Sequence, residues 1–231
     1  MKYIKLYESY GDIDSICKEY CIENYTINSD GTVDVDDVVS LYNRELTKLP
    51  LKFGKVNGNF SCSNNLLTTL EGCPKSVGGS FNCNDNSLIS LEFCPQSVGG
   101  NFYCNNNKLE KLEGPQSVGG YFSCSSNNIT TLEGCPQSVG GSFYFSFNKL
   151  KDLYGFPEFF DNLVFYGNNP VSEILDLFPD RSLGKVIYLL NEYGVIQQDG
   201  NLVVLGRLEE VFYTLNIEIP KRIKLKNYEV Y

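Results

Sequence analysis

The sequence contains no histidine among its 231 residues. This absence excludes a Ser-His-Asp triad, a Cys-His pair and any metal site with an imidazole ligand. All nine cysteines lie between residues 17 and 135, so the C-terminal region has no thiol nucleophile. No glycine motif has the spacing of a phosphate-binding loop. We therefore predict that the chain is not an enzyme, binds no metal and needs no cofactor.

Positive charge is scarce as well: 19 Lys and Arg stand against 28 Asp and Glu, for a net charge of −9. Nucleic-acid binding requires clustered cations against phosphate, so we expect no nucleic-acid partner. The sequence has no apolar run of membrane-spanning length, and its first residues have no signal-peptide core. We expect a protein made in a cytoplasm, without a membrane partner, whose cysteines are reduced thiols that pack as small apolar residues.

A repeat of 20 or 21 residues fills the middle of the chain. Each unit reads F-x-C-x-x-N-x-L-x-x-L and continues as E-G-C-P-Q-S-V-G-G, with some substitutions. The first position is occupied by Phe60, Phe81, Phe102, Phe122, Phe143 and Val164. The fifth is always asparagine, at Asn65, Asn86, Asn107, Asn127, Asn148 and Asn169.

This unit resembles the leucine-rich repeat, with Phe and Cys in place of its first two leucines. Phe and Cys stand two residues apart, so on a short strand both point inward. The strand then turns at the asparagine, whose amide can bond backbone groups that the bend leaves unpaired. Pro and Gly-Gly return the chain without room for a long helix. We predict an α/β leucine-rich-repeat solenoid of short 20–21-residue repeats with one parallel β-sheet.

The ends of the chain predict caps, since a solenoid would otherwise expose an apolar cross-section. A degenerate first rung begins at Val39, which gives about seven rungs. Before it, Ile13, Ile16, Cys17, Tyr20 and Cys21 have helical spacing, and a hairpin follows. After it we expect a helix around residues 182–193, a hairpin over 195–204, a helix over 207–215 and a strand over 223–230. The predicted domains are 1–34 (N-terminal cap), 35–175 (solenoid) and 176–231 (C-terminal α/β cap).

The outward strand positions carry no charge, and their aromatic residues gather in the later repeats. Tyrosine among Ser and Asn is the composition of adaptable protein-binding surfaces. Ser and Asn are also good solvated strand residues, and that alternative remains open. Because clustered exposed rings usually mark a contact, we predict a partner-binding patch. Its residues are Tyr103, Tyr121, Tyr144, Phe147, Phe165, Asn82, Asn101 and Asn105.

Three segments, over residues 24–35, 43–56 and the repeated L-E-G-C-P-Q-S-V-G-G, are similar to leucine-rich-repeat proteins of tailed bacteriophages. The similarity extends from about Asn24 to the end of the chain and includes G-N-N-P-V at residues 167–171. It implies a phage-encoded protein that works in the host bacterial cytoplasm. We expect a binder or inhibitor of a host bacterial protein, such as a defence factor, acting through the concave sheet face. A structural or adhesive component of a virion or cell surface is the alternative.

Overall fold

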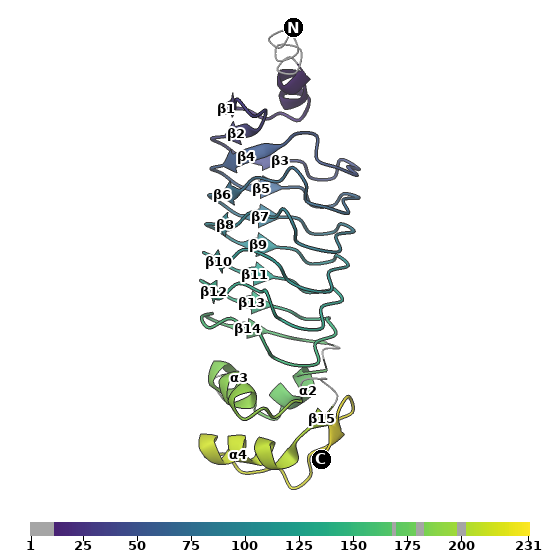
Figure 1. Cartoon of the computed structure of the whole chain (residues 1–231), viewed down its shortest axis with the longest axis vertical. Helices are drawn as coiled ribbons and strands as arrows, with labels where there is room; N and C mark the ends of the chain where they lie inside the picture. Colours follow the sequence, from purple (N-terminus) through teal and green to yellow (C-terminus); the bar gives the residue numbers. More distant parts are fainter. Residues whose placement is uncertain (1–11, 168–169, 179–182, 198–201) are drawn as a thin grey trace.

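The computed structural model describes residues 12–167, 170–178, 183–197 and 202–231. Figure 1 shows a column of stacked rungs with a helix at the N-terminal end and helices α2, α3 and α4 at the C-terminal end. The predicted α/β solenoid with caps at both ends is confirmed. Residues 1–11, Asn169, and residues 179–182 and 198–201 of the predicted C-terminal cap lie outside the described residues.

The repeat phenylalanines form one sheet along the column, which we call the Phe sheet. Neighbouring rungs pair in parallel and in register, so that Phe81 lies between Phe60 and Phe102. Seven short strands make up this sheet: β3 (Val39–Ser40), β5 (Phe60–Ser61), β7 (Phe81–Asn82), β9 (Phe102–Tyr103), β11 (Phe122–Ser123), β13 (Phe143–Tyr144) and β14 (Leu163–Val164).

A second sheet, which we call the Val sheet, was not expected from the sequence. It pairs the valines that precede Gly-Gly, such as Val77 with Val98, and begins with an antiparallel hairpin. Its seven strands are β1 (Tyr25–Ile27), β2 (Val33–Val35), β4 (Phe53–Val56), β6 (Ser76–Val77), β8 (Ser97–Val98), β10 (Ser117–Val118) and β12 (Ser138–Val139). The solenoid therefore has two sheets instead of the single sheet that we predicted.

The core is a set of side-chain columns that run the length of the solenoid. The fully buried rings of Phe60, Phe81 and Phe102 follow one another with centroids 5.7 and 5.1 Å apart. Beside them lie the fully buried thiols of Cys62, Cys83, Cys104 and Cys124 and the repeat leucines. Such continuous burial of apolar surface is the main stabilisation of a repeat fold.

The thiols of the core are unreactive. All nine cysteines are free, in agreement with the predicted reduced state. Burial raises the pKa of Cys83, Cys104 and Cys124 well above that of an ordinary thiol, and it raises the pKa of Cys94 to about 12. Because the thiolate is the reactive form, these sulfurs act as small apolar residues and not as nucleophiles.

The repeat asparagines form a hydrogen-bonded ladder at the turn, as predicted. Asn107 Nδ2 donates to the carbonyls of Cys83 and Cys104, at 3.1 Å each. Its Oδ1 accepts the N–H of Leu88 at 3.0 Å. One side chain thus bonds backbone groups of its own rung and of the preceding rung. Asn65, Asn86, Asn127 and Asn148 make the equivalent contacts.

Gly-Gly allows successive rungs to approach closely. A Cβ at Gly119 would lie 2.1 Å from the carbonyl oxygen of Gly99, and one at Gly140 would lie 2.2 Å from that of Gly119. Real Cβ contacts are never so short, so a side chain there must push the rungs apart. The last rung has Asp161 and Asn162 at these two positions.

The last rung departs from the predicted register. Phe143 pairs with Leu163, one residue earlier than the 21-residue repeat predicts, and Val164 lies beside Tyr144. The prediction that Val164 occupies the inward Phe position is therefore wrong. The bridge of Ser138 to Phe159 keeps the 21-residue spacing, so the last rung is one residue shorter between Phe159 and Leu163, in the segment where the other rungs have Gly-Gly.

The N-terminal cap is a helix followed by the β1–β2 hairpin. The helix covers residues 12–19 of the described chain and buries Cys17 completely. Cys21 lies beyond its end, has a φ of 54° and is exposed. The prediction that both thiols face the core is thus correct for Cys17 and wrong for Cys21.

The described part of the C-terminal cap contains three helices: α2 (Ser172–Leu175), α3 (Leu183–Glu192) and α4 (Leu205–Leu215). The buried rings of Phe178 and Phe212 stack at 4.6 Å. Ile196 bridges Val203 in antiparallel fashion, as expected for the predicted hairpin. Of the strand predicted over 223–230, only β16 (Glu229–Val230) forms, and it pairs in parallel with β15 (Leu202–Val203).

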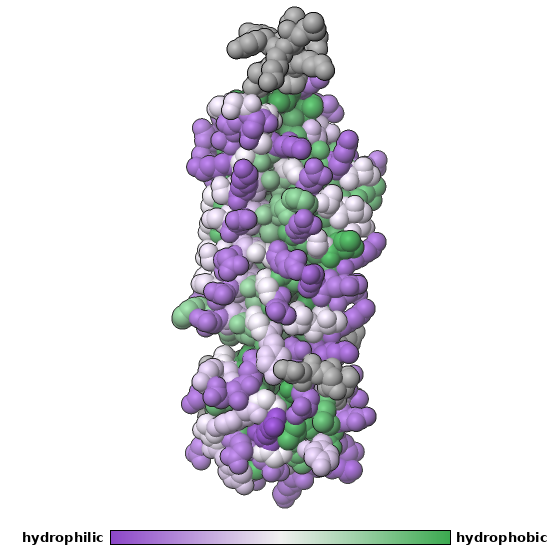
Figure 2. Space-filling model, viewed as in Figure 1, coloured by the Kyte–Doolittle hydropathy of each residue, from purple (hydrophilic) through white to green (hydrophobic). Residues whose placement is uncertain are grey.

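Side-chain contacts connect the end of the chain to α2 and to the column. The Glu173 carboxylate accepts the backbone N–H of Lys226 at 2.6 Å and that of Asn227 at 3.1 Å. The hydroxyl of the buried Tyr228 donates to the Lys151 carbonyl at 3.0 Å. A carboxylate here takes the place of a neighbouring strand. Figure 2 shows that hydrophilic residues cover most of one side of the molecule, with small apolar areas between them.

Candidate protein-binding face

The residues at the outward positions of the Phe sheet form a face that we call the Tyr face, in which Ser63, Ser142 and Ser146 are themselves buried. In each rung, the first column lies before the inward Phe, the second between the inward Phe and Cys, and the third after the inward Cys. By rung, they are Asn59, Ser61 and Ser63; Ser80, Asn82 and Asn84; Asn101, Tyr103 and Asn105; Tyr121, Ser123 and Ser125; Ser142, Tyr144 and Ser146; and Asn162, Val164 and Tyr166. None of these residues is charged. A partner can therefore be received here without the desolvation of an ionised group.

Aromatic rings gather at the C-terminal half of the Tyr face, as the sequence predicts. Tyr121 is 45% exposed, and its ring meets that of Tyr144 edge to face, with centroids 6.0 Å apart. Tyr103 and Tyr144 are half-buried and stand in one column, two rungs apart, which is roughly 10 Å at the usual strand spacing. Rigid rings held in this way lose little entropy on binding.

Phe147 adds an exposed ring beside this cluster, in a strained backbone conformation. Its φ is 55°, at the position where other rungs have Asn64, Asp85, Asn106 and Ser126. Short polar residues tolerate this left-handed conformation, whereas a bulky residue there costs about 1–2 kcal/mol. Its side chain is nevertheless 53% exposed, so burial offsets only part of that cost. Strain of this kind is typical of functional positions.

The register shift changes the predicted patch at two residues. Phe165 was predicted to face outward, but it packs against the core and stacks on Phe145 at 6.0 Å. Tyr166 was assigned to the inward position and instead points outward, with 74% of its surface exposed. Phe165 is therefore removed from the candidate site and Tyr166 is added. The loss of Gly-Gly in the last repeat is the sequence signal that could have revealed this exchange.

The three predicted asparagines lie on the Tyr face, and two of them also serve the fold. Asn101 Oδ1 accepts the N–H of Tyr121 at 2.8 Å, and Asn82 Oδ1 accepts that of Asn84 at 3.0 Å. Asn105 is half-buried in the third column. Substitution of Asn82 or Asn101 would therefore disturb the rungs themselves, and the tyrosines are the better positions at which to test binding.

The described residues hold neither a cluster of metal-binding side chains nor a membrane-spanning helix. No three His, Cys, Asp or Glu side chains in this part of the chain are grouped so that they could hold a metal ion. None of the described helices has the length and apolar character needed to cross a membrane. In comparisons with protein families, curated proteins and solved structures, nothing matches this chain.

Proposed function

We propose that the chain is a non-catalytic protein-binding module that uses the Tyr face. The observation that carries this proposal is the cluster of Tyr103, Tyr121, Tyr144 and Phe147 on an uncharged sheet face, extended by Tyr166. Interface centres are depleted in charge and enriched in Tyr and Phe. The T-shaped pair of Tyr121 and Tyr144 supplies a preorganised anchor of this kind.

The partner that we propose is a host bacterial protein. This part of the proposal rests on the resemblance to leucine-rich-repeat proteins of tailed bacteriophages, which implies a phage-encoded chain acting in the host cytoplasm. Inhibition of a host enzyme, such as a defence factor, is a simple consequence of occupying its surface with a rigid column. The neutral face predicts that binding depends weakly on salt, because no ion pair contributes at its centre.

A matched pair of triple variants tests the proposal. Tyr103, Tyr121 and Tyr144 are changed together to Ser, and the control changes Tyr154, Tyr213 and Tyr231, which are exposed elsewhere. Affinity capture from a bacterial lysate, followed by mass spectrometry, should give one stoichiometric partner for the original chain and for the control. The Tyr-face variant should bind this partner with a Kd weaker by more than about 100-fold, since hot-spot residues contribute 2 kcal/mol or more each.

Two outcomes would contradict the proposal. If the Tyr-face variant captures the partner as well as the control does, the partner binds elsewhere on the molecule. If the chain is instead found as a component of purified phage particles, with no stoichiometric cytosolic partner, the structural or adhesive role is favoured.

A further inference from the structure

A groove lies between the last rung and the C-terminal cap, next to the Tyr face, with which it shares Asn162. Two adjoining cavities of about 680 and 550 Å³ form it, and they share Glu158, Phe160 and Gly184. One wall is residues 156–163 of the last rung, and the other is residues 183–192, which form α3. We call this feature the cap groove. Its size suits a short extended stretch of polypeptide, not a flat protein surface.

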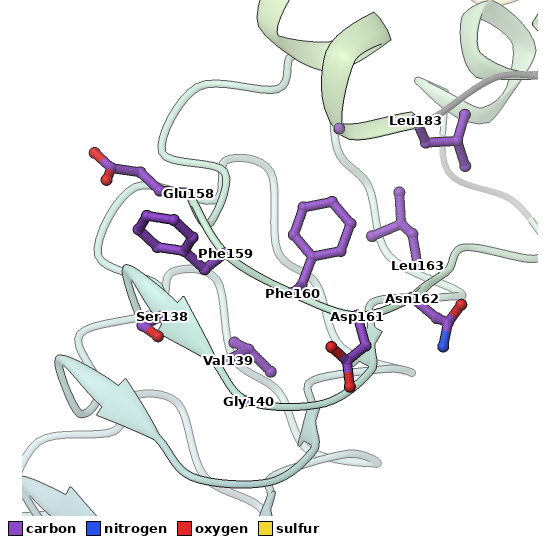
Figure 3. Close-up of a pocket in the computed structure, with 11 residues that line it drawn as sticks. Ser138, Val139, Gly140, Glu158, Phe159, Phe160, Asp161, Asn162, Leu163 and Leu183 are labelled. Atoms are coloured by element: carbon purple, nitrogen blue, oxygen red, sulfur yellow. The ribbon is translucent and has the colours of Figure 1, made fainter.

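The floor of the cap groove is aromatic. Phe159 is 66% exposed, Tyr188 from α3 is 62% exposed, and the half-buried ring of Phe160 lies between the two cavities. Figure 3 shows the rings of Phe159 and Phe160 on opposite sides of the last-rung segment, with Leu183 at the start of α3. Exposed rings in a concave site favour apolar side chains of a ligand.

The rim of the cap groove is acidic. Glu158, Asp161 and Glu192 line it with exposed side chains, and no Lys or Arg is among the lining residues that the structure describes. In Figure 3 the carboxylates of Glu158 and Asp161 lie at the two ends of the segment that carries the phenyl rings. The carboxylate of Glu192 raises the pKa of Tyr188, which is a sign of the negative potential over this wall. Such a rim attracts cations and repels acidic segments.

The cap groove also contains the end of the Val sheet. Beyond β12 a single parallel bridge joins Ser138 to Phe159, and Val139 N–H donates to the Phe159 carbonyl at 2.9 Å. The opposite edge of residues 158–161 faces away from β12, and this segment lines the cavity. A sheet edge in a groove is a template to which an extended peptide can add by main-chain hydrogen bonds.

We propose that the cap groove binds an extended segment of a partner protein in which Lys or Arg alternates with apolar residues. Side chains of an added strand alternate in direction. One set therefore packs on Phe160 and Tyr188, while the long basic side chains extend their flexible stems toward the carboxylates of the rim. This contact uses none of the aromatic residues of the Tyr face and gives the chain a second, charge-selective site.

Defined peptides test this proposal on the full chain by fluorescence anisotropy. A labelled peptide of alternating Lys and Val should bind saturably, and more weakly as salt increases. The same peptide with Glu in place of Lys should bind at least about tenfold more weakly. A third peptide, N-methylated at central residues so that it cannot donate main-chain hydrogen bonds, should also lose about tenfold in Kd, equal to 1.4 kcal/mol.

Variants locate the site. Glu158→Gln, Asp161→Asn and Glu192→Gln together should weaken the Lys-Val peptide at least about tenfold. The matched control changes exposed Glu92, Glu110 and Glu210 to Gln, which gives the same net charge. Equal weakening in both triples, or saturable binding that N-methylation leaves unchanged, would overturn the proposal, as would no binding of the Lys-Val peptide. The Tyr-face variant should bind the peptide normally, so this proposal and the proposed function can fail separately.

Discussion

Replacement of Asn127 by Ala tests how much the asparagine ladder stabilises the solenoid. The side chain is 7% exposed, and its Oδ1 accepts the Leu109 N–H at 3.0 Å. Its Nδ2 donates to the carbonyls of Cys104 and Cys124, at 3.1 and 3.0 Å. In the variant, the Leu109 N–H loses this acceptor, and each of the two carbonyls loses one donor.

The geometry of the ladder sets the size of the effect. The Cys104 carbonyl keeps the bond from Asn107, and the Cys124 carbonyl keeps the bond from Asn148. A buried unsatisfied N–H costs about 1–3 kcal/mol, and each lost carbonyl bond costs about 0.5–1.5 kcal/mol. We therefore expect a loss of about 3 kcal/mol in the free energy of unfolding. The neighbouring Asn128→Ala should cost less than about 0.5 kcal/mol. Asn128 bonds the Leu109 carbonyl through its backbone N–H, which the substitution leaves in place.

Urea unfolding followed by circular dichroism measures the global effect, and hydrogen exchange measures the local one. A loss of about 3 kcal/mol should speed exchange of the Leu109 amide by about 100-fold in the Asn127 variant if local opening controls exchange. If both variants lose less than about 1 kcal/mol and Leu109 stays equally protected, water or a shifted backbone replaces the amide, and the ladder is not a major source of stability.

Four further predictions follow from close packing, strain and burial. Gly119→Ala should lower the free energy of unfolding by about 2–3 kcal/mol, because its Cβ would meet the Gly99 carbonyl. The control Gly206→Ala has open space around it in α4 and should be neutral or stabilising, as measured by thermal unfolding. Phe147→Asn should stabilise the fold by about 1 kcal/mol in urea unfolding, because it relieves the strain of the left-handed backbone, and it should weaken partner binding. A destabilised variant would show that packing of the ring on Gly167 outweighs the strain. The exposed Cys21 should react with a thiol reagent in the native protein, whereas Cys83, Cys104 and Cys124 should react after unfolding. Burial raises the pKa of these three thiols above the unfolded value of about 8.5. Their contribution to the free energy of unfolding is therefore complete below about pH 8.5 and falls as the pH rises above it. A free energy of urea unfolding that stays constant up to about pH 10 would contradict this pH dependence.

The repeat itself was readable from the sequence because each feature depends on local chemistry. Phe and Cys two residues apart must face the same side of a strand, and the structure buries both completely, as at Phe81 and Cys83. The asparagine at the turn was expected to bond backbone groups, and Asn107 does so in two rungs. The uncharged outward positions and the tyrosines among them were visible for the same reason.

Tertiary structure decided the features that depend on contacts between rungs. The Val sheet consists mostly of two-residue strands, which are too short to show a periodic pattern and which form when successive rungs supply hydrogen-bond partners. The exchange of Phe165 and Tyr166 between core and surface follows from the one residue by which the last rung is shorter between Phe159 and Leu163. The cap groove exists because α3 packs beside the last rung. The sequence by itself thus determined the direction of side chains within a rung, while the stacking of rungs, a long-range packing effect, decided the second sheet, the final register and the groove.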